Sequence, residues 1–213
     1  KTDTCCGPDT RWRVTTDGAG IRGPAIDVLV ADPGNPDVLY AGTGDALRNR
    51  PFAFGASGLL KSSDGGESWT VLGADVFTPI YAQPAGEYPQ RRSISAIAVD
   101  PRAGRRLAVG TSQGLYVSAD GGSSWTGPCL TNGFTSQRQD VSALLALDDG
   151  ASTRLIVAIG SLRNASSVRY DLGRNGASGV YATAMPDASP ISRNRPSGTC
   201  CRRCRCSSCS SSR

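Results

Sequence analysis

Two aspartates recur in the same short motif and are the first candidates for chemistry. The segments SSDGGESW (62–69) and SADGGSSW (118–125) both read S-x-D-x-G-x-x-W and start 56 residues apart. A recurring carboxylate could serve as a general acid or base. It can equally accept hydrogen bonds from backbone N–H groups and close a tight turn. We interpret Asp64 and Asp120 as turn-closing residues and assign them no catalytic role.

The other positions of the motif suit such a turn. The serine can add a hydroxyl hydrogen bond, and the second glycine permits a positive φ. The tryptophan can bury its ring against the adjoining strands, where aromatic burial supplies much of the local stability. We therefore interpret these residues as structural: Ser62, Asp64, Gly66, Trp69, Ser118, Asp120, Gly122 and Trp125.

Other catalytic chemistry has little support in the sequence. The 213 residues contain no histidine, which excludes a Ser-His-Asp or Cys-His triad and any histidine metal site within this chain. Glycoside hydrolysis usually needs two carboxyl groups. Four acids lie in long loops, but none belongs to a recognisable catalytic motif: Asp45, Asp75, Glu87 and Asp171. Enzymatic activity stays uncertain, and we assign no catalytic residue, cofactor or metal ligand.

Three long irregular segments combine arginine with aromatic residues, at 44–57, 75–92 and 161–177. Aromatic rings stack on sugars or side chains, and guanidinium groups bind carboxylates in bidentate fashion. The predicted partner is a glycan or a protein or peptide ligand. The candidate ligand-binding residues are Arg48, Arg50, Tyr81, Tyr88, Arg91, Arg92, Arg169 and Tyr170. The alternative is solvated arginine on polar loops, since the chain has many arginines and two lysines.

The two motifs belong to longer repeats. Residues 26–43 align with 94–111 at an offset of 68, and residues 58–66 align with 114–122 at an offset of 56. The first copy thus has 12 additional residues within 44–57. A third, degenerate copy consists of VSALLAL, RLIVAIG and GVYATA, with Met185 where the aspartate should stand.

Period-2 alternation within each copy, interrupted by Asp-Pro and glycine-rich turns, predicts short strands. Four short antiparallel strands repeated every 40–60 residues or so are typical of propeller blades. We predict an all-β fold, a partial β-propeller of about three four-stranded antiparallel blades. The expected organisation is an N-terminal arm or end of a preceding blade (1–24), blades at 25–74 and 75–130, a degenerate third blade (131–192) and a low-complexity tail (193–213).

Strand alternation also predicts which face could bind a ligand. The motif joins strands three and four, so it marks one end of every blade. Loops from strand two to three, and from one blade to the next, lie at the opposite end. All three arginine-containing loops fall there, and long loops in a compact domain are often functional.

The motif resembles the Asp-box, also called the bacterial neuraminidase repeat. Together with I-x-x-x-x-x-D-P, L-Y-A-G-T and G-L-x-x-S, it resembles the propellers of xyloglucan-specific glycoside hydrolases, sortilin-type receptors and photosystem II assembly factors. The resemblance covers about residues 12–192 and implies a secreted or periplasmic glycoside hydrolase-like propeller. The alternative it leaves open is a non-catalytic protein-interaction or assembly module.

The sequence departs from these families where catalysis would lie. In the xyloglucanase-like pattern an aspartate directly follows the Y-A-x-T element, whereas Gly44 stands there and Asp45 comes one residue later. Sialidases resemble the chain through the box alone, because the R-I-P motif is missing and no Tyr–Glu pair can be identified. Catalysis within this segment is therefore not expected.

The ends of the chain differ from its middle. Trp12 in CCGPDTRW could end a worn box of a preceding blade, or lie in an irregular arm. The tail contains C-x-x-C-x-C-x-x-C (201–209), a spacing that suits zinc or copper(I). We interpret the tail instead as disordered or as the product of a frameshift, because it lacks the composition to build a core.

Net charge argues against a nucleic-acid partner, and hydropathy argues against a membrane-spanning segment. The formal net charge is +5, but residues 193–213 hold six arginines and no acid. Without them 17 basic residues oppose 18 acidic ones, so no nucleic-acid partner is indicated. No apolar run approaches the length of about 18 residues that a membrane span needs. The chain starts at Lys1 without a visible signal peptide, so we expect a segment of a longer propeller whose remaining blades are missing.

Overall fold

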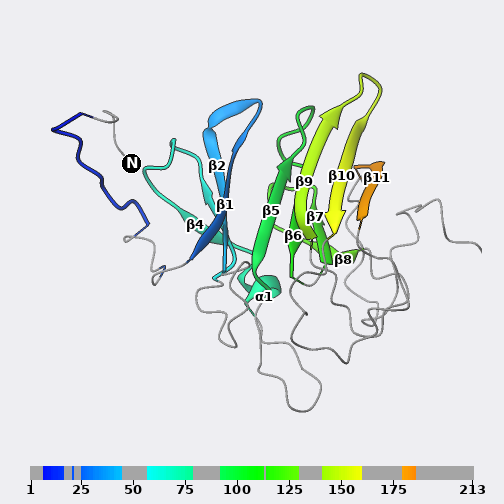
Figure 1. Cartoon of the computed structure of the whole chain (residues 1–213), viewed down its shortest axis with the longest axis horizontal. Coiled ribbons are helices and arrows are strands. Elements are labelled where there is room, and N and C mark those ends of the chain that lie inside the picture. Colours follow the sequence, from blue (N-terminus) through cyan, green and yellow to red (C-terminus); the bar gives the residue numbers. More distant parts are fainter. Residues whose placement is uncertain are drawn as a thin grey trace, which may run out of the picture.

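The protein is nearly all β in this computed structural model, which describes residues 7–16, 21, 25–44, 57–78, 92–112, 114–129, 141–159 and 179–185. Its strands form two four-stranded sheets and one three-stranded sheet, each antiparallel, with the order of the strands in space following the chain (Figure 1). The predicted all-β fold, a partial β-propeller, is confirmed.

The strands have the following bounds. Sheet 1 consists of β1 (Ile26–Asp32), β2 (Asn35–Thr43), β3 (Leu59–Ser62) and β4 (Thr70–Leu72). Sheet 2 consists of β5 (Ile94–Val99), β6 (Leu107–Thr111), β7 (Gly114–Ser118) and β8 (Thr126–Cys129). Sheet 3 consists of β9 (Val141–Asp148), β10 (Thr153–Ile159) and β11 (Gly179–Ala184). A single helical turn, α1 (Ala74–Phe77), begins the connection from sheet 1 to sheet 2, where an irregular linker was expected.

The sheets stack face to face with their first strands adjacent. β5 contacts β1 on one side and β9 on the other (Figure 1). Alternating side chains of β5 therefore serve two interfaces. Ile97 and Val99 join an apolar cluster with sheet 1, and Ala98 joins a second cluster with sheet 3. This explains why β5 reads as a nearly continuous apolar run: both of its faces are covered.

A glycine in the second strand of sheets 1 and 2 permits this stacking. A Cβ atom at Gly42 would lie 2.5 Å from a methyl group of Ile94, and one at Gly110 would lie 2.4 Å from Val141. Both glycines belong to the repeated Gly-Thr dipeptide at the end of the strand. The following threonine hydroxyl donates to a backbone carbonyl at the start of the third strand, as Thr43 does to Gly58 at 2.6 Å.

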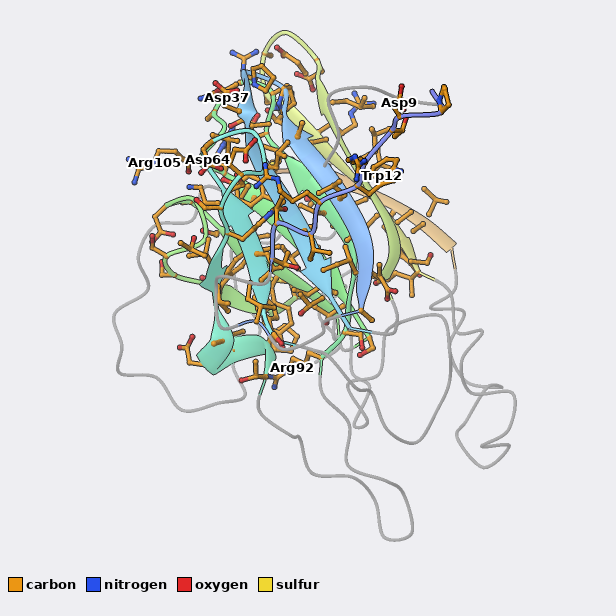
Figure 2. All side chains as sticks on the ribbon, turned by 90° about the vertical axis from the view of Figure 1, so that its left-hand side faces the viewer. Asp9, Trp12, Asp37, Asp64, Arg92 and Arg105 are labelled. Atoms are coloured by element: carbon orange, nitrogen blue, oxygen red, sulfur yellow. The ribbon has the colours of Figure 1, made fainter. Side chains whose placement is uncertain are left out.

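The connections alternate between two ends of the sheets. The turns β1–β2, β3–β4, β5–β6 and β7–β8 lie at one end, which we call the box end. The end of β2 and the start of β3, the end of β6 and the start of β7, and α1 lie at the other end, the loop end. Figure 2 shows Asp37, Asp64 and Arg105 at the box end and Arg92 at the loop end. In the part of the chain that the structure describes, no helix has the length and apolarity to cross a bilayer.

Candidate functional site

The motif at 62–69, the first box, is a closed hairpin turn between β3 and β4. Ser62 Oγ donates to Asp64 Oδ1 at 2.7 Å and accepts from the Gly66 amide at 2.8 Å. Asp64 Oδ1 also accepts from the amides of Glu67 and Ser68 at 3.0 and 2.9 Å. Its second oxygen accepts from Ser68 Oγ at 2.6 Å. Both carboxylate oxygens are thus engaged within the turn.

The motif at 118–125, the second box, repeats this arrangement. Ser118 Oγ donates to Asp120 Oδ1 at 2.8 Å and accepts from the Gly122 amide at 2.8 Å. Ser124 donates to the two oxygens of Asp120 through its amide at 2.8 Å and its hydroxyl at 2.5 Å. In both boxes the two central glycines have positive φ, between 65° and 94°. The turn therefore requires glycine at these positions.

Electrostatics keep both aspartates ionised. Hydrogen bonds from Ser68 and Ser62 hold the pKa of Asp64 well below its usual range. Burial works to raise the pKa of Asp120, but hydrogen bonds from Ser124 and Ser118 outweigh it and the pKa is lowered. A general acid needs a pKa near the working pH. The geometry and the pKa shifts together support turn closure for both boxes.

The two tryptophans of the boxes are half-buried and pack beyond their own sheets. Trp125 joins the cluster between sheets 1 and 2, where its ring meets Phe77 of α1 edge to face at a centroid separation of 5.0 Å. Trp69 packs on the opposite face of sheet 1 and donates its indole N–H to Thr15 Oγ1 at 3.0 Å. The sequence motif predicts a ring buried against the blade, and the structure adds that each ring meets the chain segment preceding its sheet.

Of the predicted ligand-binding residues, Arg92 lies in the described part of the chain, at the loop end. The other seven lie outside the described residues: Arg48, Arg50, Tyr81, Tyr88, Arg91, Arg169 and Tyr170. The Arg92 amide donates to the Phe77 carbonyl at 3.3 Å, and its guanidinium donates to the Val76 carbonyl. The guanidinium also lies over the Tyr116 ring, 5.8 Å from its centroid. Arg92 therefore anchors α1 against sheet 2 (Figure 2).

Two buried aromatic rings pack beneath Arg92 at the loop end. Phe77 meets the Tyr116 ring edge to face at 5.3 Å, and both residues are buried. Burial raises the pKa of Tyr116, although the positive charge of Arg92 opposes the shift. Phe77, Arg92 and Tyr116 therefore join α1 to sheet 2 at the loop end.

Carboxylates for hydrolysis cannot be paired from the described residues. Asp75 lies in the first turn of α1, and the other three candidate acids, Asp45, Glu87 and Asp171, lie outside the described ranges. Over those same ranges no group of three or more histidine, cysteine or acidic residues could hold a metal ion. The cysteine motif at 201–209 and the sequence between 186 and 213 are not described, so their interpretation stays a prediction.

Sequence reasoning missed a buried polar contact between sheets 2 and 3. Asp100, at the end of β5, accepts from the Thr153 hydroxyl at 2.5 Å and from the Arg102 amide at 2.9 Å, and it pairs with Arg106. Arg102 in turn pairs with Asp148 of β9 at 2.8 Å. The Asp-Pro dipeptide in both early repeats was the available signal, but it indicated a turn and not a contact between sheets.

Two curated proteins resemble the chain in sequence. A xyloglucanase from Hypocrea jecorina is 28% identical over 173 residues, covering 70% of this chain and 20% of the relative. A xyloglucanase from a Paenibacillus species is 30% identical over 103 residues, covering 47% of this chain and 9% of the relative. The chain therefore spans a fifth or less of the length of these relatives.

Two solved structures of GH74 enzymes also resemble the chain, each over part of its length. A GH74 enzyme from Niastella koreensis superposes with a TM-score of 0.43 at 20% identity, covering 75% of this chain and 21% of that chain. A GH74 xyloglucanase from Xanthomonas campestris superposes with a TM-score of 0.39 at 21% identity, covering 63% and 27%. No family model matches the sequence.

Proposed function

We propose that the chain is a segment of an exported, glycoside hydrolase-like propeller that binds a xyloglucan-type glycan at the loop end. The observation that carries this proposal is the sequence similarity to two xyloglucanases, which extends across 70% of the chain for one relative and 47% for the other. Export follows from the proposed substrate, a polymer that cells meet outside their membrane. We place the binding site at the loop end and not at the box end, because the carboxylates of Asp64 and Asp120 already accept hydrogen bonds within their own turns.

The proposed contacts combine ring stacking with hydrogen bonding. Xyloglucan is a neutral polymer, so tyrosine rings such as Tyr88 and Tyr170 would supply stacking on the sugar faces. Neighbouring arginines would donate hydrogen bonds to sugar hydroxyls. Arg92 would contribute indirectly by holding α1 in place, because its guanidinium donates to the Val76 carbonyl and packs on the Tyr116 ring. Hydrolysis, if the whole protein performs it, requires a carboxyl pair at this end.

The abundance of arginine in the three loops favours a second candidate, a non-catalytic module that binds an acidic protein or peptide. Arginine pairs with carboxylates, whereas a neutral glycan gains nothing from net positive charge. The sortilin-like or photosystem II assembly factor-like alternative belongs to this class. Salt distinguishes the two candidates, because ion pairs weaken with ionic strength and stacking on neutral sugars does not.

The test is calorimetry of the full chain with xyloglucan oligosaccharides and with an acidic peptide, each at low and high salt. Tyr88→Ala combined with Tyr170→Ala should weaken glycan binding roughly tenfold or more, as expected for lost stacking. The matched control is Arg105→Ala at the box end, which should bind like the unmodified chain. Salt-sensitive binding of the peptide alone would favour the interaction module. Binding lost on box-end changes but not on loop changes would contradict both.

A further inference from the structure

Asp-Gly dipeptides recur in the sequence, and three of them lie in turns at the box end. They stand at positions 17–18, 64–65, 120–121 and 149–150, of which the first pair lies outside the described residues. The backbone rearranges at such a dipeptide without an enzyme more readily than elsewhere, because glycine has no side chain to hinder the reaction. The three described dipeptides undergo the same chemistry in different surroundings.

The rearrangement converts aspartate into isoaspartate in two steps. The glycine amide nitrogen loses its proton and attacks Cγ of the aspartate, so that an N–Cγ bond forms and water leaves as a five-membered succinimide closes. Water then adds to the ring at the backbone carbonyl carbon and breaks its bond to nitrogen, which leaves the chain running through Cγ. Addition at Cγ instead restores aspartate. The reaction needs a free glycine amide and a carboxyl group that can turn toward it.

In the first box the neighbouring hairpin holds the glycine amide. The Gly65 N–H donates to the Asp37 carbonyl of β2 at 2.9 Å. Figure 2 shows Asp37 and Asp64 together at the box end. Both oxygens of the Asp64 carboxylate accept hydrogen bonds within the turn. Before this dipeptide can react, the first box must separate from the β1–β2 hairpin and its carboxylate must leave its donors.

The second box is held in the same way and is more deeply enclosed. The Gly121 N–H donates to the Arg105 carbonyl of the β5–β6 turn at 2.8 Å, and Gly121 is buried. The Asp120 carboxylate accepts from Ser118 and Ser124. Opening of this turn therefore exposes buried backbone as well as breaking a contact between two hairpins.

The β9–β10 turn has no such cover around its dipeptide. The Gly150 N–H donates to Oδ1 of Asp148 at 2.8 Å, and the Asp149 carboxylate accepts from the amides of Ala151 and Ser152 at 3.1 and 2.6 Å. These partners lie within 148–152, where every residue is exposed. A Cβ atom at Gly150 would meet nothing within 4 Å, and the turn projects from the end of sheet 3 (Figure 1). Local opening costs least where contacts are few and exposed.

Ionisation does not separate the first box from the β9–β10 turn. Hydrogen bonds from Ser152 lower the pKa of Asp149, just as hydrogen bonds from Ser68 lower the pKa of Asp64. The surroundings of the three glycines do differ. Gly150 is exposed, Gly65 is half-buried and Gly121 is buried.

An arginine from sheet 2 restrains the exposed turn. The Arg102 guanidinium donates to the Gly150 carbonyl at 2.7 Å and to Oδ1 of Asp148 at 2.8 Å. Arg102 thus holds both the glycine and the side chain that accepts from the glycine amide. Both contacts are exposed, so water competes with them and the restraint is partial.

We propose that Asp149 is the site at which the folded chain forms isoaspartate, and that Arg102 slows this reaction by restraining the turn. The two boxes are protected, because their glycine amides are bonded to neighbouring hairpins. Isomerisation adds a methylene group to the backbone close to Thr153, whose hydroxyl bonds to Asp100, so it acts on the contact between sheets 2 and 3. The proposal concerns the box end and is independent of any ligand at the loop end.

Peptide mapping of the full chain, aged at mildly acidic pH, tests the proposal. Trypsin should release the three dipeptides in separate peptides, 62–91, 107–138 and 139–154, in which electron-transfer fragmentation locates isoaspartate. In the folded chain Asp149 should convert about tenfold or more faster than Asp64 or Asp120, since a difference in opening free energy scales the rate exponentially. In urea the three should convert at similar rates. Equal rates in the folded chain, or faster conversion in a box, would overturn the proposal.

Three variants test the residues involved. Arg102→Ala should speed conversion at Asp149 about threefold or more, by easing local opening, and leave the rates in both boxes unchanged. Arg105→Ala is the matched control, because it removes an arginine from the same β5–β6 turn but keeps the carbonyl that accepts from Gly121. Asp149→Glu should abolish the signal in peptide 139–154, because glutamate must close a six-membered ring.

The outcomes of these variants separate a local role from a general one. An unchanged rate at Asp149 in Arg102→Ala would overturn the restraint by Arg102. Faster conversion at all three sites would also overturn it, because it would show a loss of stability throughout the fold. Isoaspartate that persists in peptide 139–154 of Asp149→Glu would place the reaction at another residue and overturn the assignment.

Discussion

The hydroxyl of Thr153 donates a hydrogen bond of 2.5 Å to Oδ1 of Asp100, and this buried contact joins sheet 3 to sheet 2 at the box end. The second carboxylate oxygen pairs with Arg106, so both oxygens of Asp100 are engaged. A buried carboxylate with full hydrogen bonding stabilises a fold mainly because its partners would be left unsatisfied without it.

The first prediction follows from this contact. Asp100→Ala should lower the free energy of unfolding by about 1–3 kcal/mol, because the Thr153 hydroxyl and the Arg106 guanidinium lose their acceptor. Urea unfolding monitored by tryptophan fluorescence measures the change. Asp9→Ala, at an exposed position, is the control and should leave the midpoint unchanged. Equal midpoints for both variants would show that sheets 2 and 3 do not depend on this contact.

The second prediction concerns the stability of the fold at acid pH. Burial acts to raise the pKa of Asp100, but hydrogen bonds from Thr153 and Arg102 and the charge of Arg106 lower it overall. Asp64 and Asp120 have lowered pKa values for similar reasons. A lowered folded-state pKa means that the unfolded chain binds more protons, so stability rises with pH.

Stability from these groups should be fully present above the unfolded aspartate pKa of about 3.9 and fall as pH drops below it. Thermal melts between about pH 2 and 6 should show this decline. Asp120→Asn should make this decline in stability less steep, because an amide side chain does not titrate. A decline as steep in that variant as in the unmodified chain would argue against a contribution from the second box.

The third prediction compares the two box tryptophans. Trp125→Ala should cost about 3 kcal/mol, since its ring packs between two sheets against Phe77. Trp69→Ala should cost roughly half as much, because its ring packs against the small cluster of Ile21, Ala41 and Leu60. Differential scanning calorimetry of the two variants gives the comparison. A larger loss for Trp69 would mean that the outward face of sheet 1 is better covered than the contacts indicate.

The fourth prediction concerns the glycines that let the sheets approach each other. Gly110→Ala should destabilise by about 1–3 kcal/mol, because its Cβ would lie 2.4 Å from Val141 and force sheet 3 outward. Gly150→Ala is the control, since a Cβ there meets nothing within 4 Å and the cost is limited to its positive φ. Chemical denaturation should rank Gly110→Ala as the more harmful change, and the reverse order would contradict the proposed spacing.

Features that depend on neighbours in the sequence could be predicted. The hydrogen bonds of the first box run between residues at most four positions apart, from Ser62 to Gly66 and from Asp64 to Ser68. The motif therefore contains every group that the turn uses, and its two copies form the same turn. Strand alternation likewise predicted the all-β fold, because the period of the side chains follows from backbone geometry alone.

Contacts between distant residues required the tertiary structure. Asp100 and Thr153 are 53 positions apart, and nothing near either residue indicates the other as its partner. The helical turn at 74–77 was expected as irregular linker, and it forms where Phe77 packs between Tyr116 and Trp125. For the same reason the sequence did not indicate that Arg92, predicted to bind a ligand, contacts Val76 of α1 and Tyr116 of sheet 2. The sequence determines which groups each strand presents, whereas the stacking of one sheet on the next determines which of them meet.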